Sequence, residues 1–378
     1  MKFRFKNLSA RNHPWSYPDQ ILLFTVLFLL AFGLIMVYSS SSVISMHERD
    51  DSLHYFRLHF LRVGFGLGLM LLVTFLDYRK LMQFAGIGLL AGIILLILVF
   101  VPGLGVYVNG GRRWIDIGLL RFQPSEVFKV CYILWLSRSL MRIPLVSSAF
   151  KRVILPEFLI LGLVFFLIDR QPNMSTALVV SMIGMSMIFL MYPNWWILGG
   201  IGAVGVAGSL YLVLVTPYRL KRAMAFFDPW ENQLGSGYQI IQSYVSLGSG
   251  GLSGLGLGQS RQKFFYLPEE HTDFIFAILG EEFGFVGCAI VVFAFMILAW
   301  RGFKIALNTE ELFGRLMAYG ITVYIMIQAL INLLVVSGLI PPTGVPLPFI
   351  SYGGTALVIN LVSTGFLLAI SRYCRYEN

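Results

Sequence analysis

The chain has 378 residues, of which 57% are hydrophobic and only 12% are charged, and its mean hydropathy is +0.77. A soluble domain cannot bury so much apolar surface, because a globular surface needs far more polar cover. The net charge of +9 is assigned to membrane topology, since no surface pattern of aromatic and basic residues calls for a nucleic acid.

The sequence predicts an all-α, polytopic membrane protein that forms one transmembrane domain over residues 1–378. Ten apolar stretches are long enough, or nearly so, to span a bilayer at about 1.5 Å rise per residue. They are approximately 20–38, 60–76, 82–101, 124–140, 153–168, 174–191, 195–215, 273–299, 315–339 and 347–371, of which the fourth and fifth are short. The first follows a basic tail at 1–19 and ends without a convincing cleavage site, so we expect a membrane helix there.

Basic residues predict the orientation of these spans. If the amino terminus is cytoplasmic, the inner segments hold most of the lysines and arginines, among them Arg79, Lys80, Lys151 and Arg152. The short outer loops then hold far fewer, as the positive-inside rule requires. Ten spans place both termini in the cytoplasm.

The largest segment without a span, 216–272, is predicted to be an outer loop with interfacial helices. Residues 218–228 alternate basic and apolar side chains at helical spacing, and a second amphipathic piece covers 239–247. The glycine-rich run 248–258 lacks the Lys-Ser/Thr end of a nucleotide loop. We therefore expect a compact loop whose backbone needs positive φ.

A second irregular loop is predicted at 340–354, where repeated prolines and glycines prevent a continuous helix. Irregular backbone at membrane depth is tolerated only inside protein or beside a wet cavity. We expect this loop to dip back toward an outer cavity that Asp273 also borders.

Asp273 lies where the outer loop meets an apolar helix, and ionisable groups at membrane depth are functional by default. The helix amino terminus favours its anion, whereas apolar surroundings favour its acid, so Asp273 could act as a base toward a hydroxyl group. Glu281 and Glu282 lie about 12–13 Å further along the helix. This is too far for either to act with Asp273 as a catalytic carboxylate pair on one bond. We expect a structural or proton-linked role for them. His271 has no spacing for zinc.

Two further sets of charges stand in the outer half of the bundle. Glu126 and Lys129 are spaced i,i+3 and can pair on one helix face. They form either a structural ion pair or a site where Lys129 meets an anionic substrate that Glu126 orients, and both can hold at once. Arg112 and Arg113, followed by Trp114, either extend to the interface or bind a diphosphate. The three cysteines show neither a disulfide framework nor a metal-site spacing.

Four motifs carry a resemblance to a known family. The segments 267–276 (LPEEHTDFIF), 112–115 (RRWI), 123–126 (QPSE) and 348–354 (PFISYGG) resemble the SEDS family of shape, elongation, division and sporulation proteins, in the right order along the chain. Residues 222–230 and 258–266 are more similar to the division-type than to the elongation-type members of that family.

The resemblance implies a peptidoglycan glycosyltransferase that polymerises lipid II on the outer side of the bacterial inner membrane, at the division septum. It implies a class B penicillin-binding transpeptidase and other division proteins as partners. The family's essential aspartate falls on Asp273, which could also bind a divalent cation (Mg or Mn), and no organic cofactor is expected. The substrate-binding positions expected are Arg112, Arg113, Trp114, Gln123, Glu126, Lys129, Gln171, Asn173, Thr176, Lys263 and Ser351.

One departure from the family pattern concerns Asn173, which stands where the family usually has an aspartate. The amide keeps an oxygen and a donor but lacks the charge, so an electrostatic or metal-binding role does not transfer. Three alternatives stay open for the whole chain: an elongation-type polymerase, a lipid II flippase and a scaffolding division protein. A flippase needs a route from the inner face, where the loops are short, and a scaffold has no need of Asp273.

Overall fold

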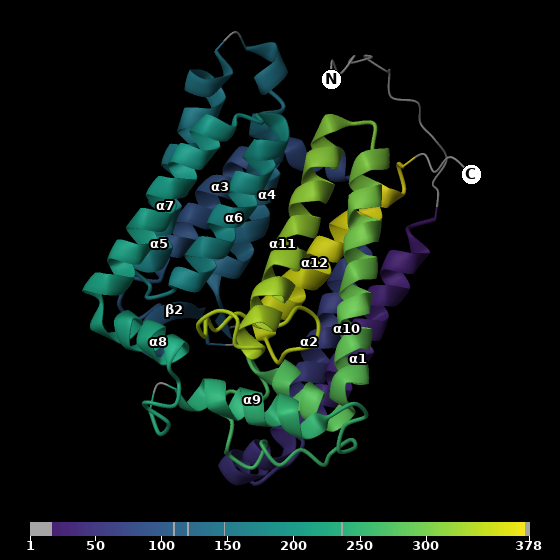
Figure 1. Cartoon of the computed structure of the whole chain (residues 1–378). Coiled ribbons are helices and arrows are strands. Elements are labelled where there is room, and N and C mark those ends of the chain that lie inside the picture. Colours follow the sequence, from purple (N-terminus) through teal and green to yellow (C-terminus); the bar gives the residue numbers. More distant parts are fainter. Residues whose placement is uncertain (1–16, 109, 119–120, 147, 236, 375–378) are drawn as a thin grey trace.

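The computed structural model describes residues 17–374 except 109, 119–120, 147 and 236, and it is mainly helical (Figure 1). The α-helices are α1 (Gln20–Arg49), α2 (His54–Thr74), α3 (Leu81–Leu98), α4 (Pro124–Leu140), α5 (Leu155–Asp169), α6 (Met174–Met191), α7 (Trp195–Val215), α8 (Pro217–Phe227), α9 (Tyr238–Gly250), α10 (Ile275–Asn308), α11 (Leu312–Val336) and α12 (Gly354–Ser371). Short turns at Tyr78–Lys80 and Ile143–Leu145 and a π-helical turn at Phe150–Ile154 lie in the connections.

Within the described residues, seven helices are long and apolar enough to cross a membrane: α1, α2, α3 with the turn before it, α6, α10, α11 and α12. Residues 199–215 of α7, taken together with α8, are also long and apolar enough, but the two helices are bent by 101° relative to each other. Helices α4 and α5, with 17 and 15 residues, are the two spans that the sequence marks as short. Figure 1 shows these helices gathered in one bundle, except α8, which lies across one of its ends. The count of ten spans, and the assignment of the chain as one domain, stay predictions.

Close backbone approach holds the bundle together, as is common in membranes, where lipid is as apolar as the side chains. A Cβ at Gly365 on α12 would lie 2.7 Å from the carbonyl oxygen of Met70 on α2. A Cβ at Gly33 on α1 would lie 2.5 Å from the carbonyl oxygen of Phe349, in the irregular loop before α12. Larger residues at these two glycines would push α12 away from α2 and the irregular loop away from α1.

A buried ion pair ties three helices together at the opposite end. Arg301 on α10 donates from Nε to Asp19 Oδ2 at 2.9 Å, and the Asp19 main-chain N–H donates to Ser371 Oγ at 2.9 Å. The start of α1 and the end of α12 therefore lie together, at the end of the bundle away from α8 and α9 (Figure 1). This arrangement agrees with termini on one side. Which side is cytoplasmic stays a prediction.

The predicted amphipathic segments of the large loop form helices, as α8 and α9, and both lie across one end of the bundle (Figure 1). Ser243 on α9 donates to the carbonyl oxygen of Val336 at 2.7 Å, which fixes α9 to the end of α11. The following glycine-rich loop has positive φ at its glycines from 251 to 258, as expected, with +104° at Gly256.

The predicted span 273–299 corresponds to α10, which is not a continuous helix. Helix α10 is interrupted at Gly284, whose φ of 65° and ψ of −163° are not helical. The glycine-rich loop occupies the break: the N–H of Leu255 donates to the Glu281 carbonyl oxygen at 3.0 Å, and the N–H of Phe285 donates to the Gly251 carbonyl oxygen at 2.9 Å. These bonds replace the helical ones that Gly284 interrupts.

A small antiparallel sheet, which the sequence analysis did not anticipate, lies between α3 and α4 in the chain. Its strands are β1 (Gly105–Val108), β2 (Gly111–Asp116) and β3 (Arg121–Phe122), in the order β1-β2-β3. The Asn-Gly pair at 109–110 in the sequence is the usual signal for a hairpin and could have predicted it. Residue 109 itself lies outside the described residues.

Candidate active site

Asp273 lies directly before Phe274, the N-cap residue of α10, and its side chain is partly buried. Its Oδ2 atom is 3.2 Å from the position that a Cβ would take on Gly344, a residue with a φ of 71°. The N–H of Tyr352 donates to the carbonyl oxygen of His271 at 2.9 Å. The irregular loop at 340–354 therefore borders Asp273, as the sequence analysis expected.

The surroundings of Asp273 raise the pKa of its carboxyl group toward neutral pH. Burial, and next the nearby Glu269 carboxylate, raise the pKa of Asp273 from 3.8 to about 7, against the opposing charges of Arg222 and Arg113. A general base works best when its pKa lies near the operating pH. Asp273 thus combines the position and the pKa of a proton acceptor.

The two neighbouring arginines do not converge on one point. Both are on β2, where successive side chains point to opposite faces of a sheet. Arg113 donates to the carbonyl oxygens of Gln171 and Pro172 at 3.3 and 2.5 Å and is near enough to Asp273 to influence its charge. Arg112 is exposed. The second positive charge beside Asp273 is Arg222 on α8, which sequence reasoning missed although its basic and apolar spacing had marked the helix.

Trp114 and Gln123 lie at the edges of the same region. The guanidinium carbon of Arg121 lies 5.6 Å from the centre of the Trp114 ring. Gln123 immediately precedes α4, and its main-chain N–H donates to Thr355 Oγ1 at 3.1 Å, which ties the start of α4 to α12. Substrate contact by either side chain stays a prediction.

Glu126 and Lys129 form the ion pair that their spacing predicted. Lys129 Nζ lies 2.7 Å from Glu126 Oε1, and the two side chains are only 1% and 5% exposed. Lys129 Nζ also lies 5.0 Å from the centre of the Tyr324 ring on α11. The second carboxylate oxygen of Glu126 has no partner among the described residues. The pair is therefore present and buried, and its contact with substrate stays a prediction.

A row of buried polar side chains on α11 connects this ion pair to Asp273. Tyr324, Gln328 and Asn332 follow one another at i,i+4, so they share one face over about 12 Å. Each keeps an oxygen without a partner among the described residues. Buried polar groups are normally hydrogen-bonded, so these three oxygens stand out among the buried side chains of α11. Polar residues at helical spacing within an apolar span were the signal that could have found them.

Three predicted binding residues support the start of α6. Asn173 Oδ1 accepts from Thr176 Oγ1 at 2.9 Å and from the Thr176 N–H at 3.4 Å, as helix-capping residues do. Gln171 donates from Nε2 to the carbonyl oxygen of Leu96 at 2.9 Å. All three side chains are buried. The structure gives them supporting contacts, and a direct contact with substrate stays a prediction.

Lys263 belongs to the break in α10. Its Nζ donates to the Gly258 carbonyl oxygen at 2.6 Å and lies 3.4 Å from Glu282 Oε1. Glu281 accepts from the N–H of Arg261 at 3.0 Å and from Ser260 Oγ at 2.5 Å. These contacts fit the structural role that was expected for the two glutamates, and they assign Lys263 to the same cluster.

Ser351, the last predicted binding residue, acts within the irregular loop. Its Oγ accepts from the N–H of Leu347 at 2.8 Å, and the side chain is buried. This bond closes the turn at 347–351, where the Ser351 N–H also donates to the Leu347 carbonyl oxygen at 3.0 Å.

The family of cell cycle proteins that includes FtsW, RodA and SpoVE matches residues 20–376. The chain belongs to this family. It is the SEDS family whose motifs the sequence resembles, and the match covers the bundle, the outer loops and Asp273.

The sequences of individual relatives align with this SEDS protein over nearly its whole length. Stage V sporulation protein E of Bacillus subtilis is 44% identical over 359 residues, which cover 95% of this chain and 98% of the relative. The probable peptidoglycan glycosyltransferase FtsW of Coxiella burnetii is 40% identical over 361 residues, covering 94% of this chain and 96% of the relative.

Solved structures of the family show the same fold. RodA of Thermus thermophilus is 28% identical with a TM-score of 0.71, covering 96% of this chain and 99% of RodA. A chain described under "Structural coordination of polymerization and crosslinking by a peptidoglycan synthase complex" is 30% identical with a TM-score of 0.78, covering 96% of this chain and all of its own length. Relatives named for division, rod shape and sporulation all match, so these likenesses do not choose between the three roles.

The described residues of the SEDS chain contain no group of three or more His, Cys, Asp or Glu side chains that could hold a metal ion. Mg²⁺ is commonly bound through one or two carboxylates together with substrate phosphates. The part of the chain that the structure describes forms no cage of protein ligands, and a cation shared by Asp273 and a phosphate-bearing substrate stays a prediction.

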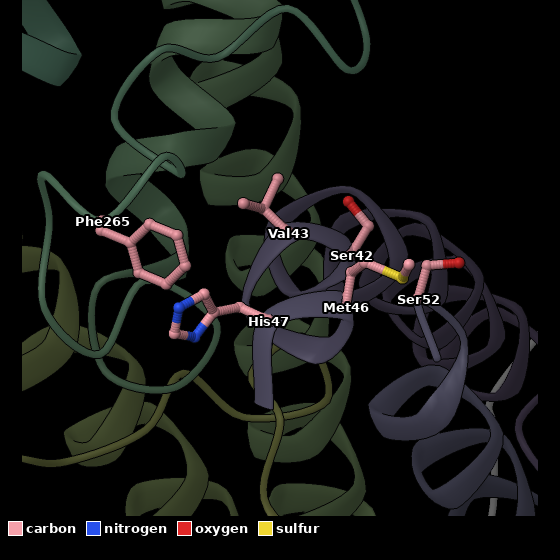
Figure 2. Close-up of a pocket in the computed structure, with 6 residues that line it drawn as sticks. All are labelled: Ser42, Val43, Met46, His47, Ser52 and Phe265. Atoms are coloured by element: carbon pink, nitrogen blue, oxygen red, sulfur yellow. The ribbon is translucent and has the colours of Figure 1, made fainter. Parts of the chain in front are cut away.

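A separate pocket of about 540 Å³ lies at the carboxyl end of α1 (Figure 2). Its lining residues are Ser42, Val43, Met46, His47, Ser52 and Phe265. The His47 ring meets the Phe265 ring edge-on, with 5.1 Å between their centres. None of the predicted site residues lines this pocket, so we assign the chemistry to the region around Asp273.

Changing Asn173 tests whether an amide suffices at this position. We expect Asn173→Asp to retain polymerising activity, because a carboxylate also caps a helix and suits its amino terminus. Asn173→Ala removes the cap and should cost about 1 kcal/mol of stability, with only a moderate loss of activity. Tm and lipid II polymerisation measure the two effects. Complete loss of activity in a folded Asn173→Ala protein would show that the amide is essential.

Proposed function

We propose that this SEDS protein is a peptidoglycan glycosyltransferase that polymerises lipid II into glycan strands. The observation that carries the proposal is Asp273, a carboxyl group with a pKa near 7 between the irregular loop and two arginines. Relatives at about 40% identity bear the name of this activity. The position, the titration and the family all favour the same class of reaction.

The proposed reaction is an inverting glycosyl transfer. The 4-hydroxyl oxygen of the acceptor sugar forms a bond to the anomeric carbon of the donor, and Asp273 accepts the hydroxyl proton. The bond from that carbon to undecaprenyl diphosphate breaks, and the electron pair leaves with the diphosphate. Arg113 and Arg222 supply positive charge beside Asp273 for the leaving group, and Lys129 is a third candidate.

A divalent cation is part of the proposal. Mg²⁺ or Mn²⁺ bound between Asp273 and the diphosphate would neutralise charge on the leaving group. This assignment rests on the oxygen ligands that such ions prefer. No organic cofactor is proposed, since the transfer is neither a redox nor a carbanion reaction.

We propose further that the protein lies in the bacterial inner membrane with both termini cytoplasmic, and that it works with a class B penicillin-binding transpeptidase and other division proteins at the septum. The basic residues of the inner loops support the orientation. One structural relative comes from a peptidoglycan synthase complex whose description names both polymerization and crosslinking. This likeness supports a transpeptidase as the partner. Relatives named FtsW support division, and the 44% identity to the sporulation protein favours peptidoglycan synthesis during sporulation as the second candidate role.

A polymerisation assay with purified protein and lipid II tests the activity. We expect linear glycan that forms in the presence of β-lactams, because we assign the acyl transfer of crosslinking to the proposed transpeptidase and not to this chain. Adding the transpeptidase should raise the polymerisation rate and add crosslinks that β-lactams abolish, because binding to the outer loop at 216–272 would favour its competent arrangement.

The outcomes of this assay separate the alternatives. Crosslinked product from the isolated chain would contradict the division of labour, and an unchanged rate with the partner would contradict only the activation. Transport of lipid II across vesicles without polymerisation would identify a flippase. Absence of both activities, with and without the partner, would leave a scaffolding role.

A further inference from the structure

Asn332 on α11 uses its side-chain amide to join two segments that have no regular secondary structure. Its Nδ2 donates to the main-chain oxygen of Asp273 at 2.7 Å and to that of Val345 at 2.8 Å. Carbonyl oxygens only accept hydrogen bonds, so the two partners fix which end of the amide faces them. Both donors of the amide are therefore used.

The two acceptors belong to the two walls of the proposed catalytic site. Asp273 ends the large outer loop, and Val345 follows Gly344, which lies against the Asp273 carboxyl group. The asparagine side chain is 1% exposed and projects from a continuous helix. A helix is a more rigid support than either loop, and sites supported by rigid elements are held more accurately.

We propose that Asn332 is a positioning residue for the catalytic base, an inference that rests on the proposed function. The amide holds the Asp273 backbone at a fixed distance from the loop that borders its carboxyl group. Proton acceptance requires hydrogen-bond reach to the attacking hydroxyl, and a displacement of about 1 Å can cost about a hundredfold in rate. Asn332 touches neither the reacting atoms nor the carboxyl group and acts through the backbone.

The principal test compares Asn332→Leu, which has a similar volume and no donors, with Thr322→Val. Thr322 is buried on the same helix, and its hydroxyl donates only to the Ala318 carbonyl oxygen within α11. Asn332→Leu should lower kcat by about 10- to 100-fold with a much smaller change in KM. Thr322→Val should leave both near the wild-type values. Asn332→Gln, which retains the donors on a longer chain, should recover part of kcat.

A second measurement does not depend on activity. Hydrogen exchange of the full-length protein in detergent reports the main-chain N–H groups of Thr272, Phe274 and Tyr352, which are hydrogen-bonded in these two segments. Asn332→Leu and Asn332→Ala should both increase exchange in 269–274 and 341–352, and Thr322→Val should not. The Ala variant retains the test if the Leu variant does not fold.

These outcomes separate the inference from the activity on which it rests. Wild-type exchange in both segments of a folded Asn332 variant would overturn the inference, as would an unchanged kcat. A loss of kcat equal to that of Thr322→Val would also overturn it, since a general packing defect would then explain the loss. If wild-type protein fails to polymerise lipid II while the variants show raised exchange, the proposed function fails and the link between the two segments stands.

Discussion

Asp273→Asn is expected to abolish lipid II polymerisation while leaving the protein folded in the membrane. An amide of the same shape cannot accept the hydroxyl proton, and general base catalysis alone typically contributes 10²- to 10⁴-fold. The fold should not suffer. Because the pKa of Asp273 is higher in the folded protein than its ordinary 3.8, the ionised carboxylate destabilises the fold at pH 8. The Tm of Asp273→Asn at pH 8 should therefore equal or exceed that of the wild type.

The pH dependence gives an independent check of the same assignment. The base must be ionised to accept a proton, so kcat/KM of the wild type should fall as the pH falls through about 7. Glu269→Gln serves as the matched variant, because the Glu269 carboxylate raises the pKa of Asp273. Its activity at pH 8 should persist, and its loss of activity should occur at lower pH. Normal turnover by Asp273→Asn would remove Asp273 from the catalytic role.

Lys129→Met is expected to have the second large effect, on both stability and activity. It leaves the Glu126 carboxylate buried without its partner, and breaking a buried pair in this way costs about 3–5 kcal/mol. The Tm in detergent should fall accordingly. Arg219→Met is the matched control, because Arg219 pairs with Asp169 at the same distance of 2.7 Å but with both side chains more exposed. Its effect on Tm should be much smaller.

The double variant Glu126→Gln with Lys129→Met separates the two interpretations of the pair. Removing both charges should restore most of the stability, because no uncompensated charge remains in the bundle. We expect polymerisation to stay low, since the positive charge for an anionic substrate is still absent. Recovery of both stability and activity in the double variant would show that the pair is structural only.

The sequence was most informative where the signal is local. The break at 340–354 follows from its prolines, the Glu126–Lys129 pair from its i,i+3 spacing, and α8 from its alternation of basic and apolar residues. The interruption of α10 did not follow in the same way. A helix with Gly284 in its interior is permitted by sequence, and only the glycine-rich loop that occupies the break makes the interruption stable.

The residues of the site also differ in whether a local sequence signal could identify them. Asp273 could be found from sequence because a carboxylate at the start of an apolar helix is anomalous on its own. Local signals mark α8 and the polar face of α11, but they do not show what Arg222 and Asn332 contact, since each acts on a residue some fifty or more positions away. Arg112 and Arg113 were expected either to extend to the interface or to bind a diphosphate, and the strand that carries them points their side chains to opposite faces.

Sequence by itself therefore determined that this is a helical membrane protein of the SEDS family, with one carboxylate at the entrance to an apolar helix and a proline-rich loop that cannot be helical. Tertiary structure decided which charges surround that carboxylate, what holds its backbone and why its pKa is near 7. The physical reason is the separation along the chain over which each effect acts. Hydropathy, helical spacing and proline act over a few residues, whereas the charge and burial of Asp273 depend on α8, α11 and the irregular loop, which come together only when the bundle packs.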